Sequence, residues 1–230
     1  MNGVISKFMY CSSETMQKYN AEMREVSHGI LKVVLCSLGV DVTEQYSSPL
    51  FDKSQGWLRM NFYHNKNNHD NQQQRYSKAH TDIGCLTILY QDHVGGLQIR
   101  TKEGEWINTK PLPGSFVVNI GDCLQVNLST SLSLKLNLEI ITKTSDRDGW
   151  QMWSNGRYRS AEHRVVYAGS ERLSMAFFLD FTDKAEIRAP EELIDEKHPR
   201  KYKGVTFEDL KAYFMKAGPT LGGPPAYFLL

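Results

Sequence analysis

Apolar residues recur at helical spacing in the first part of the chain. Six of them lie three or four positions apart, with charged residues between them: Met16, Tyr19, Met23, Val26, Ile30 and Val33. This period is typical of an amphipathic helix that buries one face, and Gly39 suits the residue just beyond the C-terminal end of such a helix. We therefore interpret residues 1–56 as a helical N-terminal segment that packs on a following core.

From Trp57 onward the pattern changes to short apolar or alternating runs separated by glycine and proline turns. These runs are residues 57–63, 86–90, 95–101, 105–109, 115–120, 163–167 and 172–181. Such spacing predicts an antiparallel sandwich or barrel, mainly β with flanking helices, and not alternating βαβ units. The polar residues 64–78 are predicted to form a surface loop in which His64 and His69 are solvated.

The C-terminal end returns to a helical pattern. Pro190 suits the first position of a helix, and Thr206 with Asp209 resembles a capping box that opens another helix ending near Gly218. Residues 183–230 are therefore interpreted as a C-terminal helical segment.

Composition and charge limit the partners and the compartment. The 230 residues carry a net charge of +1, which disfavours a dominant attraction to nucleic acid or to an anionic membrane. The four cysteines are dispersed without a CxxC pair, which favours a reducing interior. The most apolar stretch, residues 30–38, is too short to span a bilayer. These features predict an intracellular protein with no nucleic acid, no membrane and no protein partner that can be inferred.

Three residues form a candidate metal site. His80 and Asp82 project to the same side of an extended segment, and His163 opens a later strand-like run. Two histidines and a carboxylate match the facial triad of non-haem Fe(II) oxygenases, although they could also hold zinc for hydrolysis. Arg172 and Ser174 share one side of the next strand and suit the binding of a carboxylate. A zinc hydrolase has no need of that pair, so the pair favours the oxygenase.

Other polar residues near these motifs have simpler interpretations. Asp122 follows a predicted strand and is expected to stabilise a turn. Glu162 points to the opposite face of the strand from His163, so it is not expected to be a ligand. His93 lies in a predicted turn and is expected to be exposed.

Several long motifs, in order, resemble one known family. They are HTD at 80–82, GGLQIR at 95–100, PGSFVVNIGD at 113–122, SNGRYRSAEHRV at 154–165 and RLSMAFF at 172–178. These segments resemble the C-terminal catalytic half of the plant 2-oxoglutarate- and Fe(II)-dependent dioxygenases. The resemblance implies a cupin-like double-stranded β-helix, or jelly roll, as the catalytic domain over residues 57–182.

The resemblance also implies residue roles. His80, Asp82 and His163 match the residues that bind iron, and Arg172 and Ser174 match those that hold the distal carboxylate of 2-oxoglutarate. Two further matches complete the co-substrate pocket, namely Tyr63, whose phenol would contact the co-substrate, and Asn61, which would lie beside the metal. No catalytic side chain is expected beyond the metal ligands.

The implied cofactors are Fe(II), 2-oxoglutarate as co-substrate and O₂, with ascorbate as reductant. The resemblance also implies a cytoplasmic location and a small-molecule substrate as the partner. The implied reaction hydroxylates or desaturates a small organic molecule, a plant hormone or specialised metabolite, and releases succinate and CO₂.

Two departures from the family pattern support an alternative. The chain begins inside the region that usually precedes the catalytic half, and residues 126–151 are inserted between two family motifs. Because Val126 and Gln151 have codons compatible with intron ends, we hypothesise that the insertion is translated intron sequence. The other interpretation is a genuine strand or hairpin arm, since apolar and polar residues alternate over 132–140. The alternative function is thus a truncated or mis-spliced member, catalytically impaired, that at most binds metal and 2-oxoglutarate.

Overall fold

The computed structural model describes residues 14–37, 52–64, 75–101, 103–123, 138–140, 160–189 and 191–217. Most of the described chain is β-strand, with a long helix before the strands and a shorter one after them. The elements, in order, are α1 (Glu14–Ser37), β1 (Ser54–Tyr63), β2 (Arg75–His80), β3 (Leu86–Gln91), β4 (Leu97–Arg100), β5 (Trp106–Asn108), β6 (Phe116–Ile120), β7 (Leu138–Ile140), β8 (His163–Val166), β9 (Arg172–Phe181), β10 (Glu186–Ile187), the 3₁₀ turn η1 (Glu191–Leu193), β11 (Val205–Thr206) and α3 (Phe207–Ala217).

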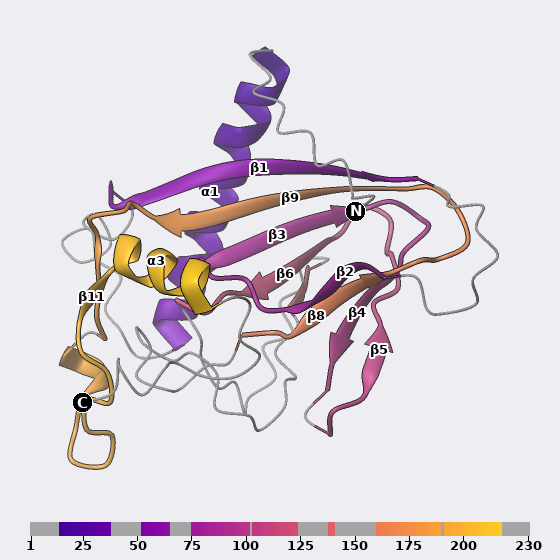
Figure 1. Cartoon of the computed structure of the whole chain (residues 1–230). Helices are drawn as coiled ribbons and strands as arrows, with labels where there is room; N and C mark the ends of the chain where they lie inside the picture. Colours follow the sequence, from indigo (N-terminus) through magenta and orange to yellow (C-terminus); the bar gives the residue numbers. More distant parts are fainter. Residues whose placement is uncertain are drawn as a thin grey trace.

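The strands form two main sheets (Figure 1). The larger sheet has the order β1-β9-β3-β6-β7 and the smaller one the order β2-β8-β4-β5, while β10 and β11 pair separately. The described strand pairs are antiparallel, apart from the parallel pair β6 and β7. Chain-distant strands become neighbours in both sheets, as in a jelly roll. The predicted sandwich with flanking helices is confirmed.

The main apolar core lies on the outer face of the larger sheet. Phe177, Leu179 and Phe181 alternate along β9 and are at most 2% exposed, and they pack in one cluster with Leu31 and Leu35 of α1. Residues of α3 join the same cluster. A second, smaller cluster lies between the sheets, on the opposite side of the same strands. The inner side of the larger sheet carries part of this smaller cluster together with the buried polar residues Asn61, Arg172 and Ser174.

The predicted N-terminal helix is confirmed, but its buried face differs from the predicted one. Val26 is 43% exposed, whereas Ser27 is fully buried. The Ser27 hydroxyl donates a hydrogen bond to the carbonyl of Met23 at 2.7 Å, so its polar group is satisfied within the helix. The helix can therefore turn a serine toward the sheet and leave a valine in solvent.

The prediction of a loop over residues 64–78 is wrong for its last part. Residues 75–78 belong to β2, which pairs with β8 through two register irregularities. Since β2 is an edge strand of the smaller sheet, it tolerates polar residues that a central strand would exclude. His69 lies outside the described residues.

The C-terminal predictions are mixed. Thr206 Oγ1 accepts a hydrogen bond from the backbone N–H of Asp209 at 3.1 Å, and the Thr206 N–H donates to Asp209 Oδ2 at 3.4 Å. This confirms the capping box that opens α3. After position 190, which is outside the described residues, the chain forms only the turn η1 and not a longer helix.

Part of the inserted interval is strand. Leu138–Ile140 form β7, which pairs with Phe116–Val118 of β6, as the alternating pattern predicts. The remainder of residues 126–151, like Gly39, lies outside the described residues, and the intron origin stays a hypothesis. The domain boundaries at 57 and 182 also stay predictions. Among the described helices, none is long and apolar enough to cross a membrane.

Candidate active site

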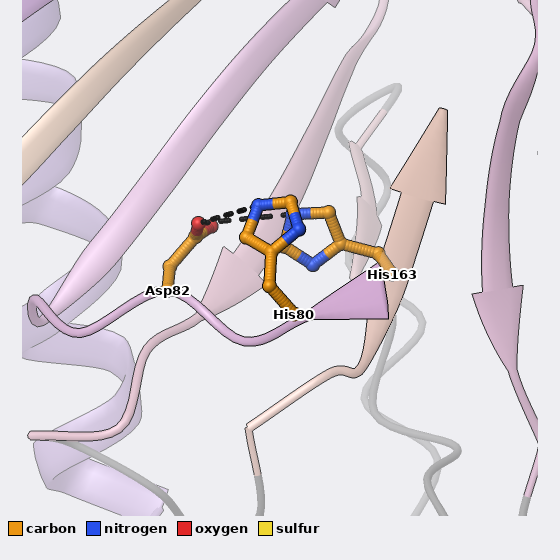
Figure 2. A group of neighbouring side chains, drawn as sticks. All are labelled: His80, Asp82 and His163. Carbon is orange, nitrogen blue, oxygen red and sulfur yellow. Dashed lines mark ion pairs between the residues drawn. The ribbon is translucent and has the colours of Figure 1, made fainter. Parts of the chain in front are cut away.

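Strand pairing brings the two candidate histidine ligands together. His80, the last residue of β2, lies directly opposite His163, the first residue of β8. Their rings are tilted against each other with centroids 4.3 Å apart. Asp82 follows His80 by two residues and turns its carboxylate toward both rings (Figure 2). A separation of 83 residues in sequence is thus closed by one cross-strand pair.

The nitrogen atoms of both histidines have defined roles. Nδ1 of His80 lies 2.8 Å from the carbonyl of Lys78, and Nδ1 of His163 lies 2.8 Å from the carbonyl of Ala161. In these contacts Nδ1–H donates to the carbonyl, which leaves the Nε2 lone pairs free. The two Nε2 atoms lie 3.8 and 3.7 Å from Oδ1 of Asp82. One ligand atom from each of the three residues falls within 4.8 Å of the others.

The electrostatics of the cluster fit a bound cation. Burial and the neighbouring His163 lower the pKa of His80, against the opposing effect of Asp82, so His80 is neutral near pH 7. Asp82 is 9% exposed, and its Oδ2 is buried without a hydrogen-bond partner among the described residues. A nearly buried carboxylate with an unpaired oxygen is costly unless it is paired or binds a metal. Two imidazoles and this carboxylate are the donor set of the facial triad that holds Fe(II).

The loop that carries Asp82 is fixed by a residue that the sequence did not reveal as part of the site. Oδ2 of Asp122 accepts a hydrogen bond from the Thr81 hydroxyl at 3.0 Å, and the N–H of Asp122 donates to the carbonyl of Asp82 at 2.7 Å. Burial raises the pKa of Asp122 to about 7, opposed by Ser160 and Thr81. Asp122 was expected to stabilise its own turn, but its side chain instead binds the residue between two candidate ligands.

The four predicted co-substrate residues lie on two neighbouring strands. Tyr63 of β1 is paired with Arg172 of β9, and Asn61 is paired with Ser174. All four are at most 7% exposed, and they share the inner face of the larger sheet. Nη1 of Arg172 donates to Ser174 Oγ at 3.2 Å, and the guanidinium lies 4.8 Å from the centroid of the Tyr63 ring. The structure therefore assembles the four residues as two adjacent cross-strand pairs.

Arg172 is a buried cation without a carboxylate partner among the described residues. Its Nε is buried and unpaired, and its Nη2 reaches Gln91 Oε1 at 3.5 Å, a long contact. Burial lowers the pKa of Arg172, opposed by the neighbouring Tyr63 and Asp92, and a guanidinium stays charged in proteins. A guanidinium in this state is suited to a dicarboxylate ligand, which would supply the missing acceptor. Gln91 is a further pocket residue, which no sequence motif indicated.

An aromatic pair lines the inner face beyond these residues. Trp57 and Phe178 stack with ring centroids 4.2 Å apart, and Trp57 Nε1 donates to Asp180 Oδ2 at 2.7 Å. Burial raises the pKa of Asp180 to about 6, although the hydrogen bond from Trp57 lowers it. The signal for this pair in the sequence is the alternation of side chains along each strand, which places Trp57 and Phe178 on the inner face.

The remaining sequence interpretations concern residues outside the site. Glu162 forms an ion pair with Arg100 at 3.1 Å and does not join the cluster, as predicted. His93 is exposed, as predicted. His64 is 63% exposed and lies 3.7 Å from Glu171, which agrees with a solvated residue.

A jelly roll whose inner face holds a His-x-Asp and a distant histidine defines the class of mononuclear metal oxygenases with a facial triad. Comparison with known proteins specifies the family. The profile of the 2OG-Fe(II) oxygenase superfamily matches residues 54–181, and the chain belongs to this superfamily. Members of this family use Fe(II) and 2-oxoglutarate.

Individual relatives agree with this family assignment. The chain is 31% identical to a gibberellin 20-oxidase-like protein of Arabidopsis thaliana over 79% of this chain and 52% of the relative. The crystal structure of a rice dioxygenase for auxin oxidation aligns with a TM-score of 0.73 at 30% identity, over 94% of this chain and 63% of that one. The structure of JOX2 with 2OG, Fe and JA aligns with a TM-score of 0.69 at 27% identity, over 91% and 54%. The chain thus spans about half the length of the relatives it matches.

Proposed function

We propose that this chain is an oxygenase that oxidises a small organic molecule with Fe(II), O₂ and 2-oxoglutarate as co-substrate. The observation that carries the proposal is the joint presence of the His80, Asp82 and His163 cluster and the buried Arg172 facing the same interior. Hydroxylation and desaturation of a hormone-like or specialised metabolite both fit, and succinate and CO₂ are the expected co-products.

The residue roles belong to the proposal. His80, Asp82 and His163 would hold Fe(II) through two Nε2 atoms and a carboxylate oxygen. Arg172 and Ser174 would bind the distal carboxylate of 2-oxoglutarate, while Tyr63 and Asn61 line the pocket between that carboxylate and the metal. Once bound, the metal and co-substrate supply the oxidising power that breaks a C–H bond.

The protein side chains position the reactants. The carbonyls of Lys78 and Ala161 fix the orientation of the two imidazoles, and Thr81 with Asp122 fixes the loop that carries Asp82. Mutation of such outer contacts typically lowers metal affinity or activity by about 10- to 100-fold. No general acid or base is needed among the described residues for the oxidation of a C–H bond.

The alternative of an impaired protein that only binds metal and 2-oxoglutarate is less favoured. Both halves of the cofactor site are assembled on paired strands, which is the arrangement that turnover requires. A cytosolic location, ascorbate as reductant and the absence of nucleic-acid or membrane partners are further parts of the proposal. The free state of Cys36, Cys85 and Cys123 supports a reducing compartment.

The test is substrate-independent turnover of 2-oxoglutarate. The full chain with Fe(II) and ascorbate should release succinate, and His80→Ala or Asp82→Ala should abolish the release and the binding of Mn(II). His93→Ala is the matched control, because it removes an exposed histidine outside the cluster. Turnover that survives either ligand substitution would refute the assignment. A folded wild-type chain that binds Mn(II) and 2-oxoglutarate but never turns over would favour the impaired-protein alternative.

A further inference from the structure

The buried hydroxyl of Thr109 has no hydrogen-bond partner among the described residues. Thr109 is the residue after β5 and is 5% exposed, and its Oγ1 is buried and unpaired. Burying a hydroxyl without a hydrogen bond destabilises a fold, whereas a valine would fill the same space without that cost. The fold itself therefore does not explain why a threonine stands at this position.

The strand register turns the Thr109 side chain toward the interior between the two sheets. Gln98 of β4 is paired with Asn108 of β5. The next rung is the hydrogen bond from the N–H of Thr109 to the carbonyl of Leu97, at 2.9 Å. Residues that lie opposite each other on neighbouring strands project to the same face, and Leu97 belongs to the buried cluster between the sheets, together with Tyr63. Thr109 therefore faces the same interior as the proposed co-substrate residues.

A side-chain bridge between the sheets links Thr109 to Arg172. Nε2 of Gln91 donates to the carbonyl of Thr109 at 3.4 Å, and Nη2 of Arg172 donates to Oε1 of Gln91 at 3.5 Å. Gln91 is the last residue of β3 and is paired with Ser174 of β9. One amide thus contacts both the guanidinium and the backbone of Thr109. This bridge places Thr109 at the end of the interior where Arg172 and Ser174 lie.

The distal carboxylate of 2-oxoglutarate has room for a further donor. A carboxylate has two oxygens that together accept about four hydrogen bonds. Arg172 offers its unpaired Nε, and Ser174 offers its own hydroxyl hydrogen, because its Oγ is the acceptor in the contact with Arg172. These two donors would fill about half of the acceptor sites. The unpaired hydroxyl of Thr109, at the same end of the interior, is suited to one of the others.

We propose that Thr109 is a further co-substrate-binding residue, whose hydroxyl donates a hydrogen bond to the distal carboxylate of 2-oxoglutarate. This inference rests on the proposed function, in which Arg172 and Ser174 hold the same carboxylate. Binding would satisfy the buried hydroxyl of Thr109 and the unpaired Nε of Arg172 together. Thr109 would thus contribute to the selection of a 2-oxo acid with a second carboxylate over one without it.

The experiment compares two 2-oxo acids that differ only at the distal end, on the full chain loaded with Mn(II). 2-Oxoglutarate carries the distal carboxylate, and 2-oxopentanoate carries a methyl group in its place. Dissociation constants are measured by calorimetry for the wild type, Thr109→Val, which removes the hydroxyl and keeps the shape, and Thr109→Ser, which keeps the hydroxyl. Thr87→Val is the matched control, because Thr87 is also buried, at 4% exposure, but is paired with Phe178, toward the other end of β9 from Arg172.

Thr109→Val should bind 2-oxoglutarate about 10- to 100-fold more weakly than the wild type, because a hydrogen bond to a charged group is lost. Its affinity for 2-oxopentanoate should not change. Thr109→Ser should retain most of the preference for 2-oxoglutarate, and Thr87→Val all of it. The melting temperature of ligand-free Thr109→Val should equal or exceed that of the wild type, since a methyl group replaces an unpaired buried hydroxyl, whereas a purely structural role of the hydroxyl would lower it.

Two results would overturn the inference alone: Thr109→Val keeps the wild-type affinity for 2-oxoglutarate, or it weakens the binding of both acids equally. The second result would assign Thr109 to the shape of the interior and not to the distal carboxylate. Mn(II) and 2-oxoglutarate binding by the wild type is measured first, because its failure would overturn the proposed function and this inference with it.

Discussion

Replacing Arg172 with methionine should separate the stability of the protein from its binding of 2-oxoglutarate. Arg172 is 2% exposed, and its guanidinium holds one 3.2 Å contact to Ser174, one 3.5 Å contact to Gln91 and one buried unpaired Nε. Losing the two hydrogen bonds and the contact with the Tyr63 ring costs about 2–4 kcal/mol, while removing the unpaired buried donor returns about 1–3 kcal/mol. Because methionine fills a similar volume, the unfolding free energy of the ligand-free protein should change by only about 1 kcal/mol.

The loss of 2-oxoglutarate binding should be far larger. Two charge-assisted hydrogen bonds to a carboxylate contribute about 3–6 kcal/mol, so the dissociation constant should rise by more than about 100-fold. The assay is the melting temperature with Mn(II), with and without 2-oxoglutarate. A ligand at about 100 times its dissociation constant stabilises the wild type by about 2.7 kcal/mol, and 1 kcal/mol shifts the melting temperature by about 2–4 °C at this size. Arg172→Met should show no such shift.

Arg164→Met is the matched control. Arg164 is 8% exposed, lies 4.1 Å from the centroid of the Trp106 ring and donates to Gln98 at 2.7 Å. Its loss should cost about 2–3 kcal/mol of stability and leave the shift induced by 2-oxoglutarate intact. A shift that persists in Arg172→Met, or a ligand-free Arg172→Met protein that is less stable than Arg164→Met, would refute the reasoning.

Three further substitutions test the supports of the site. Thr81→Val removes the hydroxyl that joins the metal loop to the buried Asp122 carboxyl group, so Mn(II) affinity should fall by about 10- to 100-fold in a titration. Gly121→Ala places a Cβ 2.2 Å from the carbonyl oxygen of Gly84, and urea unfolding should show a loss of about 1–3 kcal/mol. The pKa of Asp180, about 6 when folded against an ordinary 3.8, means that its ionisation destabilises the fold as pH rises between these values. Asp180→Asn should therefore gain stability over the wild type across that window, by at most about 3 kcal/mol above it, and an unfolding free-energy difference independent of pH would contradict this.

Local geometry was readable from the sequence where it follows from the two-residue period of a strand. That period places Asp82 on the side of His80 and Ser174 on the side of Arg172, and the structure agrees. The pairing of His80 with His163 is different, because nothing local in either segment specifies a partner so distant in the chain. It could be expected only from the resemblance to a family.

Predictions failed where a tertiary contact offset a local preference. The polar residues 75–78 form a strand because one edge of β2 is open to solvent, and Ser27 is buried because its hydroxyl is satisfied by the helix backbone. The role of Asp122 depends on the Thr81 hydroxyl, which lies 41 positions away in the sequence. Each of these contacts satisfies a polar group across the fold, which a hydrophobicity pattern does not record.

The two faces of β9 show how one strand can serve both the fold and the site. Phe177, Leu179 and Phe181 face the core against α1, where apolar burial stabilises the sheet. Arg172 and Ser174 face the interior, where polar atoms are left unpaired at a cost to stability. Because backbone pairing to β1 and β3 fixes both sets at once, the apolar face stabilises the geometry that the polar face needs before any ligand binds. The unpaired atoms of Asp82 and Arg172 are thus tolerated on a rigid support, and the proposed metal and 2-oxoglutarate would satisfy them.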